Sequence, residues 1–289
     1  MMNTEPKTST KVISFAIALC IAIYILFPFY LVIVNACKAP MYITESPVSL
    51  NGVSVGQLVS NLNDVIHNVH FQFWYAFGSS VVITVISLVL LALFGGMAAW
   101  VICRNKTAWS TLIYFTFIAS MIIPFQAVML ALISTFRDAG NFIGIPMLRS
   151  IPGTIFAYCG FGGAMTVFIL NGFIKGIPYE LEEAASIDGC PPEEIFFRII
   201  FPLLKPVIVT VSILNGMWIW NDYLLPSLIL GSNSAVKTLP VAIQSFVGSF
   251  VTQWNLILAA ALLTITPMVI IFLFAQKQII AGMVDGAIK

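Results

Sequence analysis

The sequence predicts an all-α membrane protein with six transmembrane helices. Of its 289 residues, 60% are hydrophobic and 9% are charged, whereas a soluble domain carries about 25% charged residues. A chain with so few charges could not cover its surface in water. Crossing a hydrocarbon core of about 30 Å takes roughly 20 residues of helix. Six apolar segments reach that length, at about 12–34, 77–102, 110–135, 153–173, 207–230 and 256–276.

The first apolar segment has to be distinguished from a signal peptide. Its apolar run, from Val12 to Val34, is longer than the apolar region of a signal peptide, which typically has about 7–15 residues. No small-residue cleavage site follows it. We therefore expect a retained helix.

Composition and motifs argue against several other classes of protein. A net charge of +1 does not indicate a nucleic-acid partner. The five cysteines form no CxxC pair and are odd in number, so they predict neither a disulfide framework nor a zinc site. His67 and His70 are too few for zinc, which takes three or four ligands. The sequence has no GxxxxGK[ST] phosphate loop and no catalytic constellation, so we expect a non-catalytic chain that binds no cofactor.

The distribution of Lys and Arg predicts the orientation, because cytoplasmic loops carry an excess of both. Six helices place both termini on one side of the membrane. The opposite side holds only four basic residues: Lys38, Arg137, Arg149 and Lys237. The side of the termini holds nine: Lys7, Lys11, Arg104, Lys106, Lys175, Arg198, Lys205, Lys277 and Lys289. We expect a multi-pass protein of the cytoplasmic membrane with both termini in the cytoplasm.

The loop 172–206, on the predicted cytoplasmic side, carries signals of two short helices. Pro178 suits the first position of a helix, and acidic residues in the first turns favour the positive end of the helix dipole. Gly189 suits a helix C-terminus. Pro191 and Pro192 begin a second helix, which Pro202 is expected to end. The loop contains six of the chain's twelve acids: Glu180, Glu182, Glu183, Asp188, Glu193 and Glu194.

Two interpretations of this loop compete. A short rigid helix between two membrane spans could dock a partner, and the small pair Ala184 and Ala185 would let that partner approach closely. Alternatively, the helix could lie on the membrane surface. Such helices are usually rich in Lys and Arg on their polar face. Because this helix is acidic, we favour docking.

The loop also carries a recognisable motif. Glu183-Ala184-Ala185, Asp188-Gly189 and the later Ile200-Phe201-Pro202 resemble the EAA signature of the permeases of binding-protein-dependent ABC importers. The stretch Trp220–Pro226, WNDYLLP, is similar to one found in carbohydrate permeases. The ending from Gln276 to Lys289 resembles that of the maltose-permease G-type subunit, although a usual final glycine is absent.

This resemblance implies a fold and a set of partners. The expected fold is the type I ABC importer transmembrane fold, with residues 1–76 as N-terminal tail, first helix and outer loop, 77–276 as the core, and 277–289 as a cytoplasmic tail. The implied partners are a second, F-type permease, two ATP-binding subunits that hold ATP and Mg, and an extracytoplasmic sugar-binding protein. The substrate would be a sugar, and lipid would surround the spans. The residues implied in coupling to the ATPases are Glu183, Ala184, Ala185, Asp188, Gly189 and Pro202, with Gly282, Gly286 and Lys289 in the tail.

Asp222 is the one acidic residue inside a predicted span, and an intramembrane acid is a candidate functional residue. It could form a polar wall of the sugar path together with Trp218, Trp220 and Asn221. It could equally bond its own loop backbone near the outer interface. Both interpretations stay open at this stage.

Two other transporter classes also stay open. The EAA loop is shared with ABC importers of other solutes, such as polyamines. A secondary transporter is a further alternative, but it would have no use for an acidic docking helix.

Overall fold

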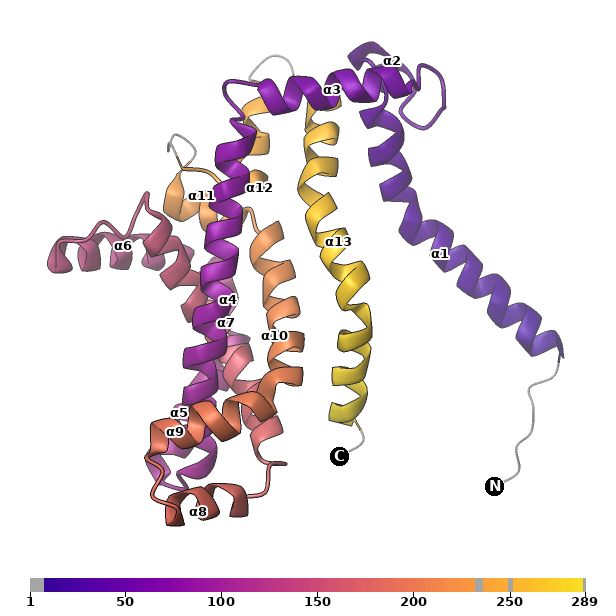
Figure 1. Ribbon diagram of the computed structural model, residues 1–289. Helices are drawn as coiled ribbons and strands as arrows, with labels where there is room; N and C mark the ends of the chain where they lie inside the picture. The colour runs from indigo at the N-terminus through magenta and orange to yellow at the C-terminus, as the bar shows by residue number, and fades with distance from the viewer. Residues whose placement is uncertain (1–7, 232–235, 249–251, 288–289) are drawn as a thin grey trace. The chain divides into compact units, whose positions relative to one another are not determined.

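The computed structural model describes residues 8–231, 236–248 and 252–287 (Figure 1). Within those ranges the regular structure is helical, apart from one isolated β-bridge between Val247 and Thr252. Five helical stretches are long and apolar enough to cross a membrane, and a bent pair of helices makes a sixth if it counts as one span. The predicted all-α class is therefore confirmed.

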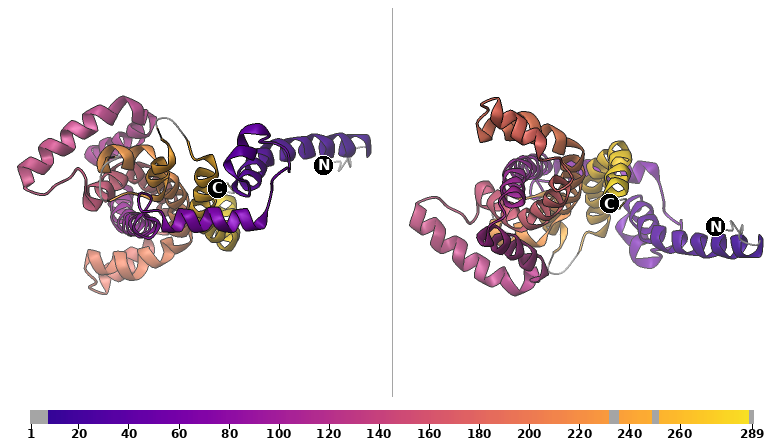
Figure 2. Two further views of the ribbon diagram at one scale, coloured as in Figure 1. Left: turned by 90° about the horizontal axis from the view of Figure 1, so that it is seen from above. Right: turned by 90° about the horizontal axis from the view of Figure 1, so that it is seen from below.

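The third predicted span, 110–135, is broken. Helix α5 (Ala108–Ile122) and helix α6 (Phe125–Ile143) meet at an angle of 110°. Proline disfavours the helical conformation in the residue before it, and Ile123, which precedes Pro124, has an extended ψ of 118°. In both views of Figure 2, α6 projects sideways from the other helices of its unit.

The fifth predicted span, 207–230, is also interrupted. Helix α10 (Phe201–Asn221) ends before Asp222, and a separate short helix, α11 (Leu224–Leu230), follows. A proline inside a helix removes one hydrogen bond and clashes with the carbonyl four residues earlier. Pro226 would meet the carbonyl of Asp222 in this way, so a continuous helix is disfavoured there.

The chain divides into two compact units, of which the first comprises Met1–Phe73 and Ile243–Ile265. It contains helices α1 (Thr8–Ala36), α2 (Pro40–Glu45) and α3 (Val55–His67), a 3₁₀ turn (Ile243–Phe246), and the start of α13 (Trp254–Ala287). Buried Asn61 links α3 to the end of α1, to Lys38 and to the start of α13. Its amide donates to the carbonyls of Ala36 and Lys38, and its oxygen accepts from Asn255. Because it contains α2 and α3, the predicted outer loop 35–76 is largely helical.

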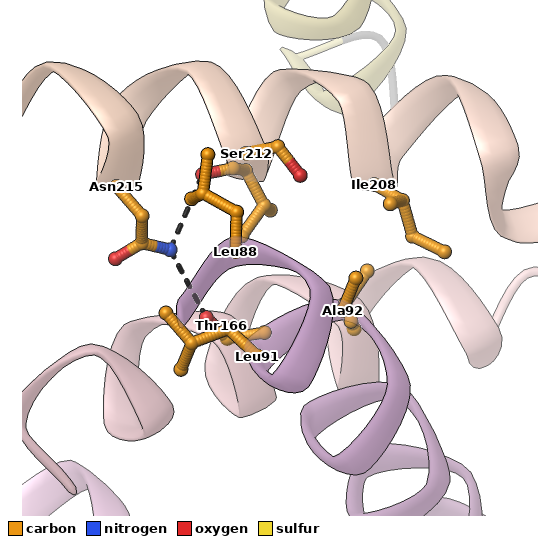
Figure 3. Close-up of a pocket in the computed structure, with 9 residues that line it drawn as sticks. Leu88, Leu91, Ala92, Thr166, Ile208, Ser212 and Asn215 are labelled. Atoms are coloured by element: carbon orange, nitrogen blue, oxygen red, sulfur yellow. Dashed lines mark hydrogen bonds between the residues drawn. The ribbon is translucent and has the colours of Figure 1, made fainter. Parts of the chain in front are cut away.

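The second unit comprises Trp74–Ala242 and Thr266–Lys289. Its long helices are α4 (Phe73–Arg104), α7 (Ile151–Ile174) and α10, and a short α12 (Leu239–Ala242) also belongs to it. Small residues bring the long helices into close contact. A Cβ on Gly95 of α4 would lie 2.6 Å from the side chain of Thr166. In Figure 3, Asn215 of α10 donates to Thr166 Oγ1 of α7 at 3.1 Å. This bond satisfies part of a polar side chain that is buried between the helices.

Candidate functional site

The predicted docking helix is present as α8 (Glu180–Ile187), between α7 and α10. Helical hydrogen bonding starts at Tyr179, whose carbonyl accepts from the N–H groups of Glu182 and Glu183 at 2.9 and 3.1 Å. The predicted start at Pro178 is thus early by two residues, because α8 begins at Glu180. The acidic first turn faces the positive end of the helix dipole, as the sequence indicates.

Gly189 ends α8 in the predicted way. Its φ is +85°, a left-handed conformation that costs other residues roughly 1 kcal/mol or more. Its N–H donates to the Ser186 carbonyl at 3.1 Å, and the next N–H, of Cys190, donates to the Ala185 carbonyl at 3.0 Å. This pair of bonds is the Schellman motif. Because a Cβ at Gly189 would meet no atom within 4 Å, the constraint on this position is conformational.

The expected stop at Pro202 is wrong. Helix α9 (Pro192–Ile195) passes into a π-helical turn (Phe196–Ile200) and then into α10, so that one helical stretch runs from Pro192 to Asn221. In the π turn, the N–H of Phe201 donates to the carbonyl of Phe196, five residues earlier. A single π turn is one way in which a helix accommodates a local disruption. Here the wide turn comes directly before Pro202, and the helix continues through it.

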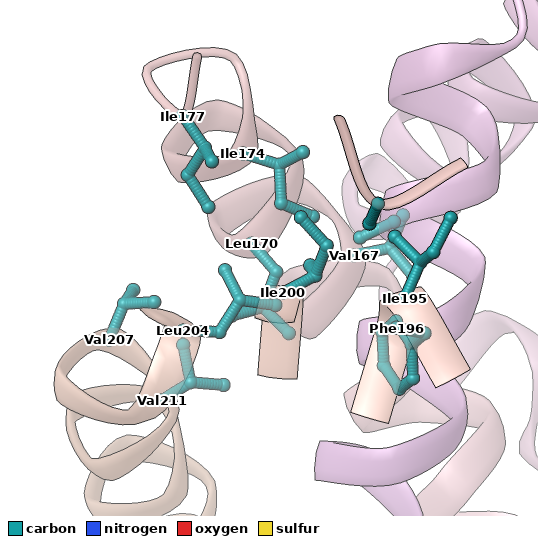
Figure 4. Close-up of a cluster of buried hydrophobic side chains, with 12 residues drawn as sticks. Val167, Leu170, Ile174, Ile177, Ile195, Phe196, Ile200, Leu204, Val207 and Val211 are labelled. Atoms are coloured by element: carbon teal, nitrogen blue, oxygen red, sulfur yellow. The ribbon is translucent and has the colours of Figure 1, made fainter. Parts of the chain in front are cut away.

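One hydrophobic cluster holds the loop against the membrane helices (Figure 4). Phe196 and Ile200 are fully buried and pack with residues of α7 and α10, including Leu170 and Leu204. Ala185 belongs to the same cluster and is only 8% exposed. Ala185 therefore packs against the chain's own core and does not lie on the exposed surface of α8 that a partner would contact. The repeat of small residues marked a face of α8, but part of that face packs on the chain's own core.

A buried ion pair anchors α8 to the end of α4. Glu182 is 6% exposed, and its Oε1 accepts from Arg104 Nε at 2.8 Å and lies 2.7 Å from Arg104 Nη2. Its Oε2 accepts from Trp100 Nε1 at 2.9 Å. The same guanidinium donates to the Ile177 carbonyl at 2.9 Å and lies 5.5 Å from the ring centroid of Tyr179. We call Trp100, Arg104 and Glu182 the anchor.

The anchor was not foreseen from the sequence, where Glu182 stood only as one of several acids in a first helical turn. Its partner Arg104 is 78 residues away in the chain and was counted only for its charge. An isolated charge buried in protein is costly unless it is paired and hydrogen-bonded. Both oxygens of Glu182 are bonded, so the anchor fixes the position of α8 relative to α4.

The exposed face of α8 lies opposite the anchor. At about 100° per residue, Leu181, Asp188, Ala184 and Ile187 follow one another around roughly 120° of the helix. All four are exposed, and Ile187 is 86% exposed. Ile187 was missed in the sequence, although its position three residues after Ala184 placed it beside the small pair. We call these four residues, together with neighbouring Glu183, the α8 face.

The residues predicted for a sugar path are only partly brought together. Trp218 is 41% exposed and packs edge-on against Tyr158 with ring centroids 5.4 Å apart, whereas Trp220 is buried against Phe77. Asp222 accepts from the Tyr158 hydroxyl at 3.2 Å and from the backbone N–H of Leu224 at 2.9 Å. Asp222 thus bonds its own loop, as one of the two interpretations expects.

The Asn221 side chain is exposed and donates to the carbonyl of Met217 in its own helix, at 2.8 Å.

At the C-terminus, α13 continues as helix through Gly282 and Gly286 to Ala287. Lys289 lies outside the described residues. Across the part of the chain that the structure describes, no group of three or more His, Cys, Asp or Glu residues could hold a metal ion.

Comparison with known proteins places this geometry in a family. Residues 92–284 match the model of the binding-protein-dependent transport system inner membrane component. The chain is 38% identical over 262 residues to the probable starch degradation products transport system permease protein AmyC of Thermoanaerobacterium thermosulfurigenes, covering 91% of each chain. It is 34% identical to the melibiose/raffinose/stachyose import permease protein MelC of Bacillus subtilis, over the full length of both.

A solved structure shares the fold. A chain of a bacterial ABC transporter involved in the import of the acidic polysaccharide alginate superposes with a TM-score of 0.74 at 18% identity, covering 95% of this chain and 99% of that one. The match confirms the expected transmembrane fold. Because the family model also covers most of the chain, including the anchor and α8, this protein belongs to the binding-protein-dependent transport system inner membrane component family.

Proposed function

We propose that this chain is one of two permease subunits of an ABC importer that carries a sugar or oligosaccharide into the cytoplasm. The relatives are named for starch degradation products and for melibiose, raffinose and stachyose, which supports a carbohydrate substrate. The observation that carries the proposal is the exposed α8 face on a helix fixed by the anchor. The family match and the sugar-importer relatives favour this function over the two alternatives, an importer of another solute such as a polyamine and a secondary transporter.

In this proposal the α8 face binds a separate ATPase subunit. Glu183, Ala184 and Asp188 are exposed there, next to the turn at Gly189. Ala185 supports the helix from its buried side instead of contacting the partner. When the ATPases close, the anchor passes the movement of α8 to α4, while the hydrophobic cluster passes it to α7 and α10. Coupling of this kind requires two conformations that the partner binds with different affinity.

The membrane part of the proposal concerns the sugar and the partners on either side. Trp218 and Asn221 are exposed near the end of α10 and are our candidates for the sugar path. Trp220 is buried and Asp222 bonds its own loop, so these two residues fit a structural role better. An extracytoplasmic binding protein would deliver the sugar. Gly282 and Gly286 would approach the ATPases as part of a helix, since α13 reaches Ala287.

Transport is expected to need the whole assembly. The purified chain alone should hydrolyse no ATP, because its sequence has no phosphate-binding loop. Reconstituted into vesicles with a second permease, the ATPase and a binding protein, it should take up labelled oligosaccharide in an ATP-dependent manner. Uptake that is driven by an ion gradient without the ATPase would reject the proposal in favour of a secondary transporter.

Both termini and α8 are proposed to be cytoplasmic, on the basis of the nine-to-four division of Lys and Arg. Reporters inserted after Asn105 and Cys190 should give cytoplasmic signals. Reporters after Leu50 and Gly248 should give extracytoplasmic ones. An extracytoplasmic signal at Cys190 would place α8 out of reach of any ATPase, and would therefore contradict the proposed coupling as well as the topology.

A further inference from the structure

A cleft separate from the α8 face lies between the end of α4, the start of α5 and the end of α7. It encloses about 570 Å³. Its walls come from the last turn of α4, the short connection to α5, the first two turns of α5 and the end of α7. The residues that line it are Ile102, Cys103, Arg104, Asn105, Lys106, Ser110, Thr111, Tyr114, Phe115, Asn171 and Lys175.

The cleft has a positive charge. Three of its lining residues are basic and none is acidic. The charge of Arg104 is already compensated by Glu182, to which it is bonded at 2.7 Å. Lys106 and Lys175 therefore supply the charge of the cleft, and both are exposed. The ammonium group of Lys175 lies 5.5 Å from the ring centroid of Tyr114, which holds this side chain against the wall formed by α5.

Polar groups that suit a phosphate lie beside these lysines. Ser110 and Thr111 line the cleft with hydroxyl groups, and Asn105 contributes an amide. They belong to the connection and first turns of α5, a 15-residue helix whose positive end favours negative charge. The Thr111 hydroxyl already donates to the Thr107 carbonyl at 3.1 Å, so the donors that the cleft adds to the two ammonium groups are the Ser110 hydroxyl and the Asn105 amide. This set fits an anionic oxygen group better than a neutral one.

One wall continues as an apolar surface. Phe115 lines the cleft and is 60% exposed, and Trp109 and Leu112 on the same helix are 74% and 56% exposed. Trp is enriched where a membrane helix meets the interface with water. A small soluble anion would use only the polar part of this cleft. A ligand with a charged head and a hydrocarbon tail would use both parts.

We propose that this cleft binds the headgroup of an anionic phospholipid, with Lys106 and Lys175 at the phosphate and the acyl chains along Phe115 and Leu112. Basic clefts between membrane helices on the cytoplasmic side are a known setting for anionic headgroups. The proposal rests on the proposed orientation only for the choice of leaflet. The lipid site itself requires only that this end of α5 lies at a membrane interface.

The test uses the full chain, purified in detergent and titrated with a short-chain phosphatidylglycerol while bound lipid is counted by native mass spectrometry. Each lysine near an anionic headgroup is expected to account for roughly fivefold in affinity, so K106Q/K175Q should bind about twenty-five-fold more weakly. The charge-conserving K106R/K175R should retain most of the binding. The matched control K205Q removes an exposed lysine that does not line the cleft, and should bind like the unchanged protein.

Other outcomes would overturn the proposal. Equal loss in K205Q would mean that diffuse surface charge attracts the lipid. Equal binding of phosphatidylcholine would remove the role of the negative charge, and full competition by glycerol phosphate would identify a soluble anion as the ligand. Unchanged lipid binding with weaker ATPase pull-down in K106Q/K175Q would assign the cleft to an acidic segment of the partner. None of these outcomes depends on which substrate is transported.

Discussion

Replacing Glu182 with alanine is expected to abolish coupling between ATP hydrolysis and uptake. The change leaves the guanidinium of Arg104, which is only 18% exposed, without its carboxylate and also removes the acceptor of Trp100 Nε1. Breaking a buried pair in this way costs about 3 kcal/mol. A penalty of that size changes the population of the anchored position of α8 by roughly a hundredfold. The measurement is oligosaccharide uptake beside ATP hydrolysis by the reconstituted importer.

The neighbouring pair of Glu194 and Arg198 provides the matched control. It is also an acid–arginine pair in the same loop, at i and i+4, but the Arg198 side chain is 78% exposed. Exposed pairs of this kind contribute no more than about 0.5 kcal/mol. E194A should therefore leave uptake and hydrolysis close to normal. If E182A and E194A behaved alike, the anchor would not transmit movement, and α8 would be held by the hydrophobic cluster alone.

Hydrolysis distinguishes two ways in which E182A could fail. Loss of uptake with ATP hydrolysis retained would mean that the ATPase still binds but its movement no longer reaches α4. Loss of both activities together with loss of ATPase pull-down would mean that the α8 face itself is no longer presented. The first outcome is expected, because the Schellman motif at Gly189 and the packing of Ala185 are unaffected by the change.

The parts of the fold that depend on residues close together in the sequence were predictable from it. Long apolar segments marked the spans, and Gly189 marked the end of α8 because a left-handed turn needs glycine there. The breaks at Pro124 and Pro226 also have local causes, yet each lies inside an apolar segment that hydropathy alone reads as continuous. At Pro202 the helix instead continues after a π turn, and two residues of that turn, Phe196 and Ile200, are buried among residues of α7 and α10 that lie outside the turn.

The candidate site could be predicted from the sequence only in part. The sequence showed that α8 has a small, acidic face, but it did not show which side of that face packs inward. That choice is made by contacts with residues far away in the chain, at Arg104 and in α7 and α10. Periodicity fixes the spacing of side chains around a helix. It does not fix the rotation of the helix about its axis, so Ala185 was assigned to the partner and Ile187 was overlooked.

Because α8 is rotated so that Ala184 points outward and Ala185 inward, tryptophan at these two adjacent positions should have different effects. Ala184 is exposed in the middle of the α8 face, whereas Ala185 is 8% exposed in the hydrophobic cluster. A184W should leave the permease as stable as the unchanged protein, because surface substitutions usually change the free energy of unfolding by about 0.5 kcal/mol or less. It should nevertheless block close approach of the ATPase, reducing pull-down and uptake by at least about tenfold.

A185W should fail for a different reason. Inserting extra atoms into a packed core typically costs about 1–3 kcal/mol, and tryptophan in place of alanine is a large insertion. This variant should therefore unfold at a lower temperature in detergent even when no ATPase is present. Thermal unfolding of the purified permease separates the two variants, and ATPase pull-down then measures docking for whichever remains folded. If A184W kept full pull-down and full uptake, the α8 face would not be the contact with the ATPase, and the proposed coupling would lose the observation on which it rests.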